Sequence, residues 1–169
     1  MLRLLVVFIH VCGAMGLFGA AAIEGASLLQ LHAPGGVPAA LRGFGLARRV
    51  GSLSFALTLA SGIALTQAVW GWQAAWIGVG LAALGVLIVI GATTSRRALG
   101  RLQAGGDASA VAAALTFSFI VRASLLIGIA FLMTVKPPLE ESLLAIAAAG
   151  GVGVLLGMPL RRRQAVRAA

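Results

Sequence analysis

Charged residues are scarce in this chain: Asp, Glu, Lys and Arg together make up 10% of its 169 residues, and only four residues are acidic. A soluble domain carries about 25% charged residues because its surface faces water. Hydrophobic residues make up 60% of the chain, and the mean hydropathy is +1.05. These values exclude a soluble enzyme, a coiled coil and a disordered protein, and they indicate a polytopic membrane protein.

Catalytic motifs are also missing. Cys12 is the one cysteine, and there is no tyrosine. An intramolecular disulfide therefore cannot form, and cysteine content does not indicate a redox compartment. The sequence has no Cys-x-x-Cys motif, no glycine-rich phosphate loop ending in Lys-Ser or Lys-Thr, and no nucleophile–base–acid set. We therefore assign no catalytic residue, and a non-enzymatic protein is the favoured interpretation.

Positive charge, in contrast, exceeds negative charge, with a net charge of +9 and a pI near 12.0. The basic residues lie between long apolar runs, and no aromatic residues alternate with them as they would in a nucleic-acid platform. This distribution argues against nucleic acid as a partner. It is typical of topology signals and of contacts to anionic lipid headgroups.

Five apolar runs are long enough to cross a bilayer, whose hydrocarbon core of about 30 Å needs ~20 helical residues. The charge-free stretch over 50–95 accommodates two spans and a turn at Trp70–Gln73, since Trp favours the headgroup level. Lys136–Pro138 ends the fourth span and Pro159 closes the fifth, because proline disfavours helix continuation. The sequence predicts an all-α, single-domain bundle of five transmembrane helices, at about residues 4–23, 50–69, 74–93, 115–135 and 142–160.

Local composition gives expectations for the chain start and the connections. The first run has ~20 apolar residues against 7–15 in a signal-peptide core, so we read it as a retained span. The connections over 33–47 and 102–110 are rich in Gly, Ala and Pro, and we expect them to be mobile. Asp107 is placed to cap a helical extension that leads into the fourth span.

Basic-rich and basic-poor connections alternate along the chain. The first and third connections carry three arginines each, the Trp turn carries no charge, and Lys136 stands with two glutamates in the fourth. The positive-inside rule then predicts an N-terminus outside and a cytoplasmic C-terminus in a bacterial-type inner membrane. A topology with four spans would place one arginine cluster on the non-cytoplasmic side of the membrane, against this rule. We expect anionic lipid headgroups to bind the basic residues of the tail, which are Arg161, Arg162, Arg163 and Arg167.

Small residues recur at every fourth position on three spans. In lipid, close backbone approach and polar contacts drive helix association, because burying Leu gains little there. These ridges therefore predict tight helix crossings within the chain, or, on the fifth span, a homodimer seam. The ridges comprise Ser54, Thr58, Gly62 and Thr66; Ala74, Gly78 and Ala82; and Ala145, Ala149, Gly153 and Gly157.

Three ionisable residues fall within or at the edge of the spans, where ionisable groups are costly and often functional. His10 and Glu24 are separated by 14 residues, which places them on one face of the first helix. Arg122 enters the fourth span from the same side as Glu24. We hypothesise a Glu24–Arg122 ion pair, with separate snorkelling of each side chain to the headgroups as the equal alternative. A proton or ion pathway through these residues is less favoured.

Metal and haem binding have little support, and we expect no cofactor. His10 alone is more often a hydrogen-bonded interior residue than a ligand. A haem held by His10 and His32 is disfavoured because His32 falls in the cytoplasmic connection and His10 lies near the opposite face. A Cu(I) site is a weaker alternative, since its soft ligands would not share one helix face; they would be His10, Cys12, Met15 and Met133.

Two segments resemble a group of small bacterial membrane proteins. They are Leu5-Val6-Val7-Phe8-Ile9-His10 and Phe131-Leu132-Met133-Thr134-Val135-Lys136-Pro137. With the short helices, they are similar to uncharacterised integral-membrane families distantly related to copper-resistance protein D. That broader group includes proteins linked to copper uptake and haem chemistry, and the resemblance makes His10 and Lys136-Pro137 the matching positions. This chain departs from the pattern because it lacks further intramembrane histidines.

Two functions follow as expectations. The first is a small non-enzymatic accessory or structural component that packs against another membrane protein or forms a homo-oligomer in the bilayer. The alternative is a transporter or helper for a proton, metal cation or small solute that uses Glu24, Arg122 and His10. A continuous polar cavity joining those three residues would favour the alternative.

Overall fold

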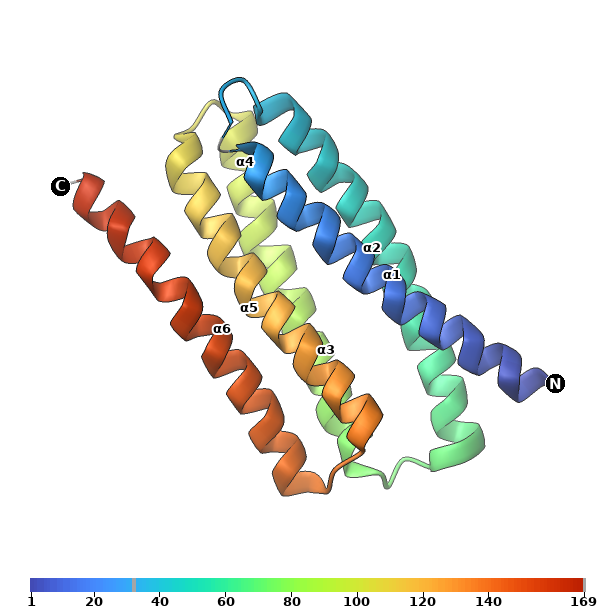
Figure 1. The fold of residues 1–169 in the computed structure, drawn as a ribbon. Helices are drawn as coiled ribbons and strands as arrows, with labels where there is room; N and C mark the ends of the chain where they lie inside the picture. The colour runs from blue at the N-terminus through green and yellow to red at the C-terminus, as the bar shows by residue number, and fades with distance from the viewer. Residues whose placement is uncertain (32, 169) are drawn as a thin grey trace.

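The computed structural model describes the backbone of residues 1–31 and 33–168, with side chains except at 108 and 160–168. Its regular structure is helical throughout this part of the chain (Figure 1). Five helical stretches are long and apolar enough to span a membrane, which confirms the predicted fold class. The elements are α1 (Leu2–Leu31), α2 (Val37–Leu65) with π-helical η1 (Thr66–Trp70), α3 (Ala75–Ile90) with π-helical η2 (Gly91–Ser95) and α4 (Arg96–Gln103), α5 (Ala108–Val135) and α6 (Leu139–Ala168).

Turn-forming residues separate the helices where the sequence predicts. Gly71 follows η1 with a φ of 72°, a conformation that side-chain-bearing residues rarely adopt. Lys136 ends α5 in the left-handed region, directly before the two prolines. Asp107 caps α5, and its Oδ1 accepts a hydrogen bond of 2.9 Å from the Ser109 backbone N–H. The Trp turn, the Lys-Pro-Pro stop and the cap are therefore all present.

Several helix ends differ from the prediction, because hydropathy marks the apolar thickness and not the end of the helix. α1 continues to Leu31, and α2 already begins at Val37, so most of the stretch 33–47 is helix and not a mobile connection. The third span continues through η2 into α4. The last helix also extends beyond its predicted end: α6 runs through Pro159, whereas the apolar candidate span ends at that proline. A proline removes only one backbone hydrogen bond, and transmembrane helices tolerate it.

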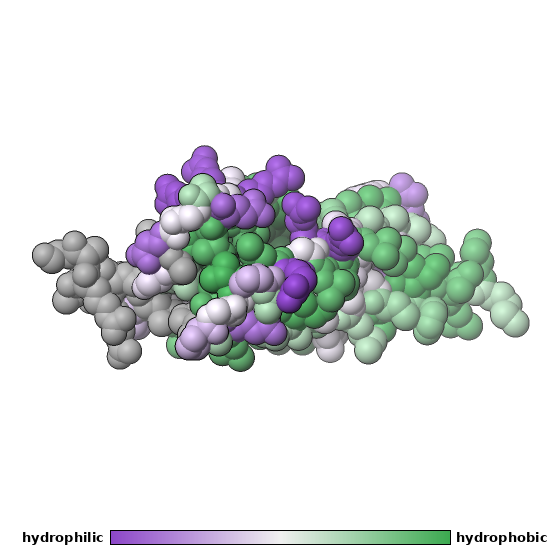
Figure 2. All heavy atoms as spheres, turned by 90° about the horizontal axis from the view of Figure 1, so that it is seen from above, coloured by the Kyte–Doolittle hydropathy of each residue, from purple (hydrophilic) through white to green (hydrophobic). Residues whose placement is uncertain are grey.

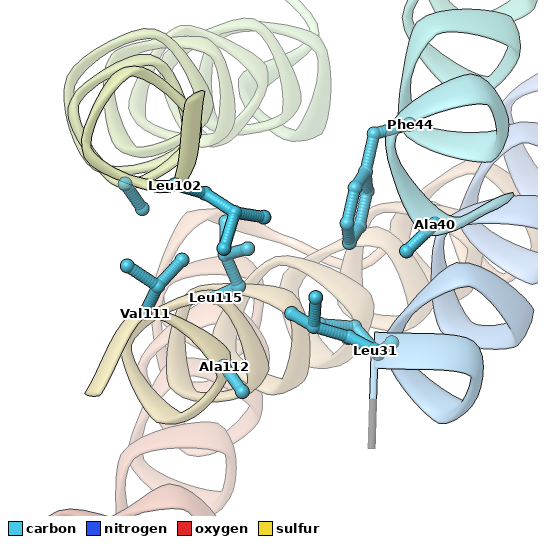
Figure 3. Packing of buried hydrophobic residues seen from close by; sticks show 9 residues of the cluster. Leu31, Ala40, Phe44, Leu102, Val111, Ala112 and Leu115 are labelled. Carbon is cyan, nitrogen blue, oxygen red and sulfur yellow. The ribbon is translucent and has the colours of Figure 1, made fainter. Parts of the chain in front are cut away.

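The helices associate as two hairpins that meet at one end. α1 packs along α2, α6 packs along α5, and α5 also contacts α1 and α3. At the end that carries the α1–α2 and α4–α5 connections, α1, α2, α4 and α5 share an apolar core (Figure 3). Its buried members are Leu28, Leu31, Ala40, Phe44, Ala98, Leu102, Val111, Ala112 and Leu115. This core holds the two hairpins together at the arginine-rich end.

Two of the three small-residue ridges are filled by a helix of the same chain. A Cβ at Gly13 of α1 would lie 2.5 Å from the Thr58 Oγ1 of α2, and a Cβ at Gly153 of α6 would lie 2.9 Å from the Val121 Cα of α5. The α6 ridge thus packs within the chain. The α3 ridge does not: Gly78 is exposed and a Cβ there would meet nothing within 4 Å. The expected tight crossing on α3 is wrong for the chain's own helices.

Hydrophilic and hydrophobic side chains are separated along the bundle. Seen from the end that carries the α1–α2 and α4–α5 connections, hydrophilic side chains gather over that end and hydrophobic ones cover the flank beyond it (Figure 2). Large apolar side chains are exposed along all five spans, for example Leu53, Val89 and Leu155. Exposed side chains of this kind suit a surrounding of lipid.

Candidate functional site

Glu24 and Arg122 form an ion pair between α1 and α5. Arg122 Nη2 donates to Glu24 Oε1, and Arg122 Nε donates to Ser118 Oγ at 3.3 Å. The two charged side chains are only 16% and 14% exposed, so neither extends freely to a headgroup. Of the two hypotheses for these residues, the structure shows the pair.

The pair lies deep in the bundle. Arg122 is fourteen residues from the first residue of α5 and thirteen from its last, so about 20 Å of helix extends on each side. A single charge at such a position is costly in hydrocarbon, and pairing reduces this cost. The ion pair therefore explains how α1 and α5 can each carry a charged residue inside the bundle.

The surroundings of the guanidinium involve two residues that the sequence did not single out. Ser118 stands one turn before Arg122, and this four-residue spacing is the sequence signal that could have identified it. Gly91 opens η2, and a Cβ there would lie 3.6 Å from both Arg122 Cδ and Nη1. Only the packing of the third span against α5 reveals this contact, because no spacing or motif in the sequence around Gly91 indicates a contact with Arg122. At this distance Gly91 lies in ordinary van der Waals contact with the arginine side chain.

His10 is a hydrogen-bonded interior residue. Its Nδ1 lies 3.0 Å from the Thr58 carbonyl oxygen and 3.1 Å from Ser61 Oγ, both on α2. With its proton on Nδ1, the ring donates to the carbonyl. A Cβ at Gly62 would lie 3.1 Å from the ring, so the glycine allows this close approach. His10 thus joins α1 to α2.

The residues considered for a metal do not form one cluster. No group of three or more His, Cys, Asp or Glu that could hold a metal occurs in the part of the chain that the structure describes. Cys12 is exposed, whereas His10, Met15 and Met133 line a cavity. His32, the second residue of the haem pair, lies outside the described residues.

A cavity of about 500 Å³ lies between α1, α2, α3 and α5, at the end away from the arginine-rich connections. It is lined mainly by apolar side chains, among them Val7, Leu17, Leu59, Leu84, Leu126 and Ile129. His10 is at its wall, but Glu24 and Arg122 are not among the lining residues. The three intramembrane candidates are therefore not connected by one polar cavity within the described residues.

The arginine tail forms the last part of α6. The backbone of α6 is helical through Ala168, but the side chains of Arg161, Arg162, Arg163 and Arg167 lie outside the described ones. Their contact with anionic headgroups remains a prediction from the sequence.

Comparison with protein-family models, with curated proteins and with solved structures finds no match for the chain. The likeness to families related to copper-resistance protein D thus stays an expectation from a few residues. By the length and hydropathy of its helices, the chain is a multi-pass membrane protein with five candidate spans.

Proposed function

We propose that the protein is a non-enzymatic accessory component of the membrane that packs through α3 against a helix of another membrane protein. The observation that carries the proposal is the open part of the α3 ridge, Gly78 and Ala82, which Gly85 extends by one turn. All three residues are exposed, and a Cβ at either glycine would meet no atom within 4 Å. Their spacing of four and three residues aligns them on one face of α3.

The other ridges show what such a surface does in this protein. Gly13 and Gly16 of α1 face Thr58 and Ser54 of the α2 ridge, and Gly153 of the α6 ridge lies against α5. Small residues serve transmembrane association because they let two backbones approach closely. Small residues that face only lipid make no such close contact between backbones. We therefore expect a further helix on the α3 ridge.

The intramembrane polar groups support an accessory role over a carrier. Glu24 is paired with Arg122, and His10 is bonded to α2. Each of these contacts joins two helices, so the groups contribute to holding the bundle together. A carrier would be expected to connect them along a polar path.

Crosslinking from α3 tests this proposal. Ala82→Cys and, as a control on the exposed face of α6, Ala148→Cys are introduced separately into a Cys12→Ser background and treated with a short thiol–amine crosslinker in native membranes. We expect position 82 to crosslink to one membrane protein of a different mass, and position 148 not to do so. A product of twice the chain mass would indicate a second copy and contradict a different partner; equal products at both positions would contradict a specific α3 surface.

A matched pair of substitutions then separates docking from folding. Gly78→Leu with Gly85→Leu fills the ridge, whereas Ala147→Leu with Ala148→Leu adds similar bulk to the exposed face of α6. We expect only the first pair to lose the copurifying protein, with the thermal unfolding of both unchanged. Equal recovery from both variants would refute docking through α3.

The carrier is the second candidate, because the cavity reaches His10. The discriminating measurement is uptake of protons, Cu⁺ or a small solute into proteoliposomes. Uptake that disappears in His10→Gln, while the Ala148→Leu control retains it, would favour the carrier over the accessory role.

A further inference from the structure

We infer that the cavity between α1, α2, α3 and α5 holds an acyl chain of an anionic phospholipid, whose headgroup phosphate lies at Arg3 and Lys136. This inference is independent of docking through α3 and goes beyond it. It concerns a lipid site at the arginine-poor end of the bundle. The arguments are the dimensions of the cavity, its lining and the charges at its rim.

The dimensions fit one leaflet. The lining extends along α5 from Leu126 to Lys136, which is about 15 Å at the helical rise. This length is about half of the ~30 Å hydrocarbon core, or the depth of one leaflet. The volume of about 500 Å³ is also within the range of roughly 300–1,000 Å³ that is typical of small-molecule sites.

The lining suits a hydrocarbon chain. Several polar atoms at the wall already have partners within the bundle: His10 Nδ1 is bonded to the Thr58 carbonyl, and Thr66 Oγ1 donates to the Gly62 carbonyl at 2.8 Å. Thr134 likewise donates to the Ala130 carbonyl at 2.8 Å. The remaining lining is mostly aliphatic and aromatic. A polar solute would find few free partners there, whereas an acyl chain needs none.

The rim carries positive charge. Arg3 and Lys136 are the two basic side chains that the topology places at this end, and both line the cavity. Lys136 Nζ lies 4.1 Å from the ring centroid of Trp70, which packs edge-to-face on Trp76 with centroids 5.6 Å apart. Trp favours the headgroup level. The rim thus combines cations, which attract a phosphate, with aromatic rings that favour the depth of the headgroups.

The acidic groups near the rim leave these cations available. Glu140 and Glu141 begin α6 shortly after Lys136; both are exposed and neither lines the cavity. Within residues 1–31 and 33–159, the ion pair found is that of Glu24 with Arg122. Arg3 and Lys136 therefore face the rim without a carboxylate partner. An anionic headgroup fits this arrangement better than a zwitterionic one, whose ammonium group would meet the same cations.

Lipid retention by the full chain tests the inference. The protein is reconstituted with phosphatidylglycerol and phosphatidylcholine in equal amounts, extracted in mild detergent and analysed by native mass spectrometry. We expect one phosphatidylglycerol per chain to be retained and phosphatidylcholine to be lost. For Arg3→Gln with Lys136→Gln, retention should fall roughly 10- to 30-fold. Arg48→Gln with Arg49→Gln removes the same charge at the other end and should leave it unchanged.

A second pair of variants tests the cavity itself. Ala14→Phe with Ala130→Phe fills the space and keeps the rim charges, while Ala148→Phe adds an aromatic ring outside the cavity. We expect the filled variant to lose the lipid and the control to keep it. An excess of inorganic phosphate should not displace the lipid, because the acyl chain contributes to binding.

Three results would overturn the inference. They are equal retention of the two lipids by the unmodified chain, an equal effect of the charge changes at both ends, and lipid retained by the filled variant. Thermal unfolding of each variant identifies any that fails to fold. In that case, Trp fluorescence of the unmodified chain decides: phosphatidylglycerol brominated on its acyl chains should quench it more than brominated phosphatidylcholine, and equal quenching would contradict the site.

Discussion

At the residue scale, the Glu24–Arg122 ion pair joins the two hairpins through opposite charges. The two residues are separated by 98 positions and connect α1 to α5. Each neutralises a charge that would otherwise stand alone among apolar side chains. Ser118 accepts a second bond from the guanidinium, so the arginine has partners on its own helix and across the interface.

Replacing the two members of the pair should have a non-additive effect on stability. Glu24→Gln leaves Arg122 as an uncompensated charge, and we expect a loss of about 3–5 kcal/mol in unfolding free energy. Glu24→Gln with Arg122→Gln should lose less than the sum of the two single changes. The measurement is a double-mutant cycle of reversible unfolding in micelles. Additive losses would show that the two side chains do not interact.

The cap of α5 gives a smaller, local prediction. Asp107→Ala removes the acceptor of the Ser109 backbone N–H, and we expect about 1 kcal/mol of destabilisation in the same unfolding assay. Asp107→Asn keeps an acceptor and is the control. The cap has no role if both substitutions give the same loss.

At the element scale, glycine contacts set how closely the helices of each hairpin approach. Gly157 and Gly153 of α6 are buried against Phe117 and Val121 of α5, while Gly151 on the same helix is exposed with open space around it. The four-residue repeat predicted this ridge from the sequence. The same repeat could not show that the α3 ridge is left open, because spacing indicates a surface suited to packing and does not indicate its partner.

A large side chain should destabilise the protein at the buried Gly153 but not at the exposed Gly151. In Gly153→Leu the new Cβ would meet the Val121 backbone at 2.9 Å, which has little freedom to move. We expect α6 to separate from α5 and stability to fall by about 1–3 kcal/mol. Gly151→Leu should change stability little. Thermal unfolding in detergent compares them, and similar melting temperatures would contradict the packing described for α6.

At the scale of the whole molecule, the spans were predictable and the space between them was not. The apolar runs, the Trp turn and the charges placed the five crossings, since hydropathy reports the solvent around a helix. Helix ends such as Leu31 and Val37 lie beyond the apolar runs predicted from the sequence, so those runs do not mark them. α1 meets α5 in the apolar core at the arginine-rich end and at Glu24–Arg122, and the cavity lies beyond these contacts. It is thus a consequence of packing between segments that are distant in sequence.

The placement of arginine on one side of the membrane depends on five crossings. Cysteines placed singly in the connections, in a Cys12→Ser background, test it directly with a membrane-impermeant maleimide on intact cells. The positions are Ala33, Gln73, Ala104 and Glu140, all of them exposed. Cysteines at 73 and 140 should be labelled from outside, and those at 33 and 104 only after permeabilisation. Labelling of 33 or 104 in intact cells, or protection of 73 or 140, would contradict it.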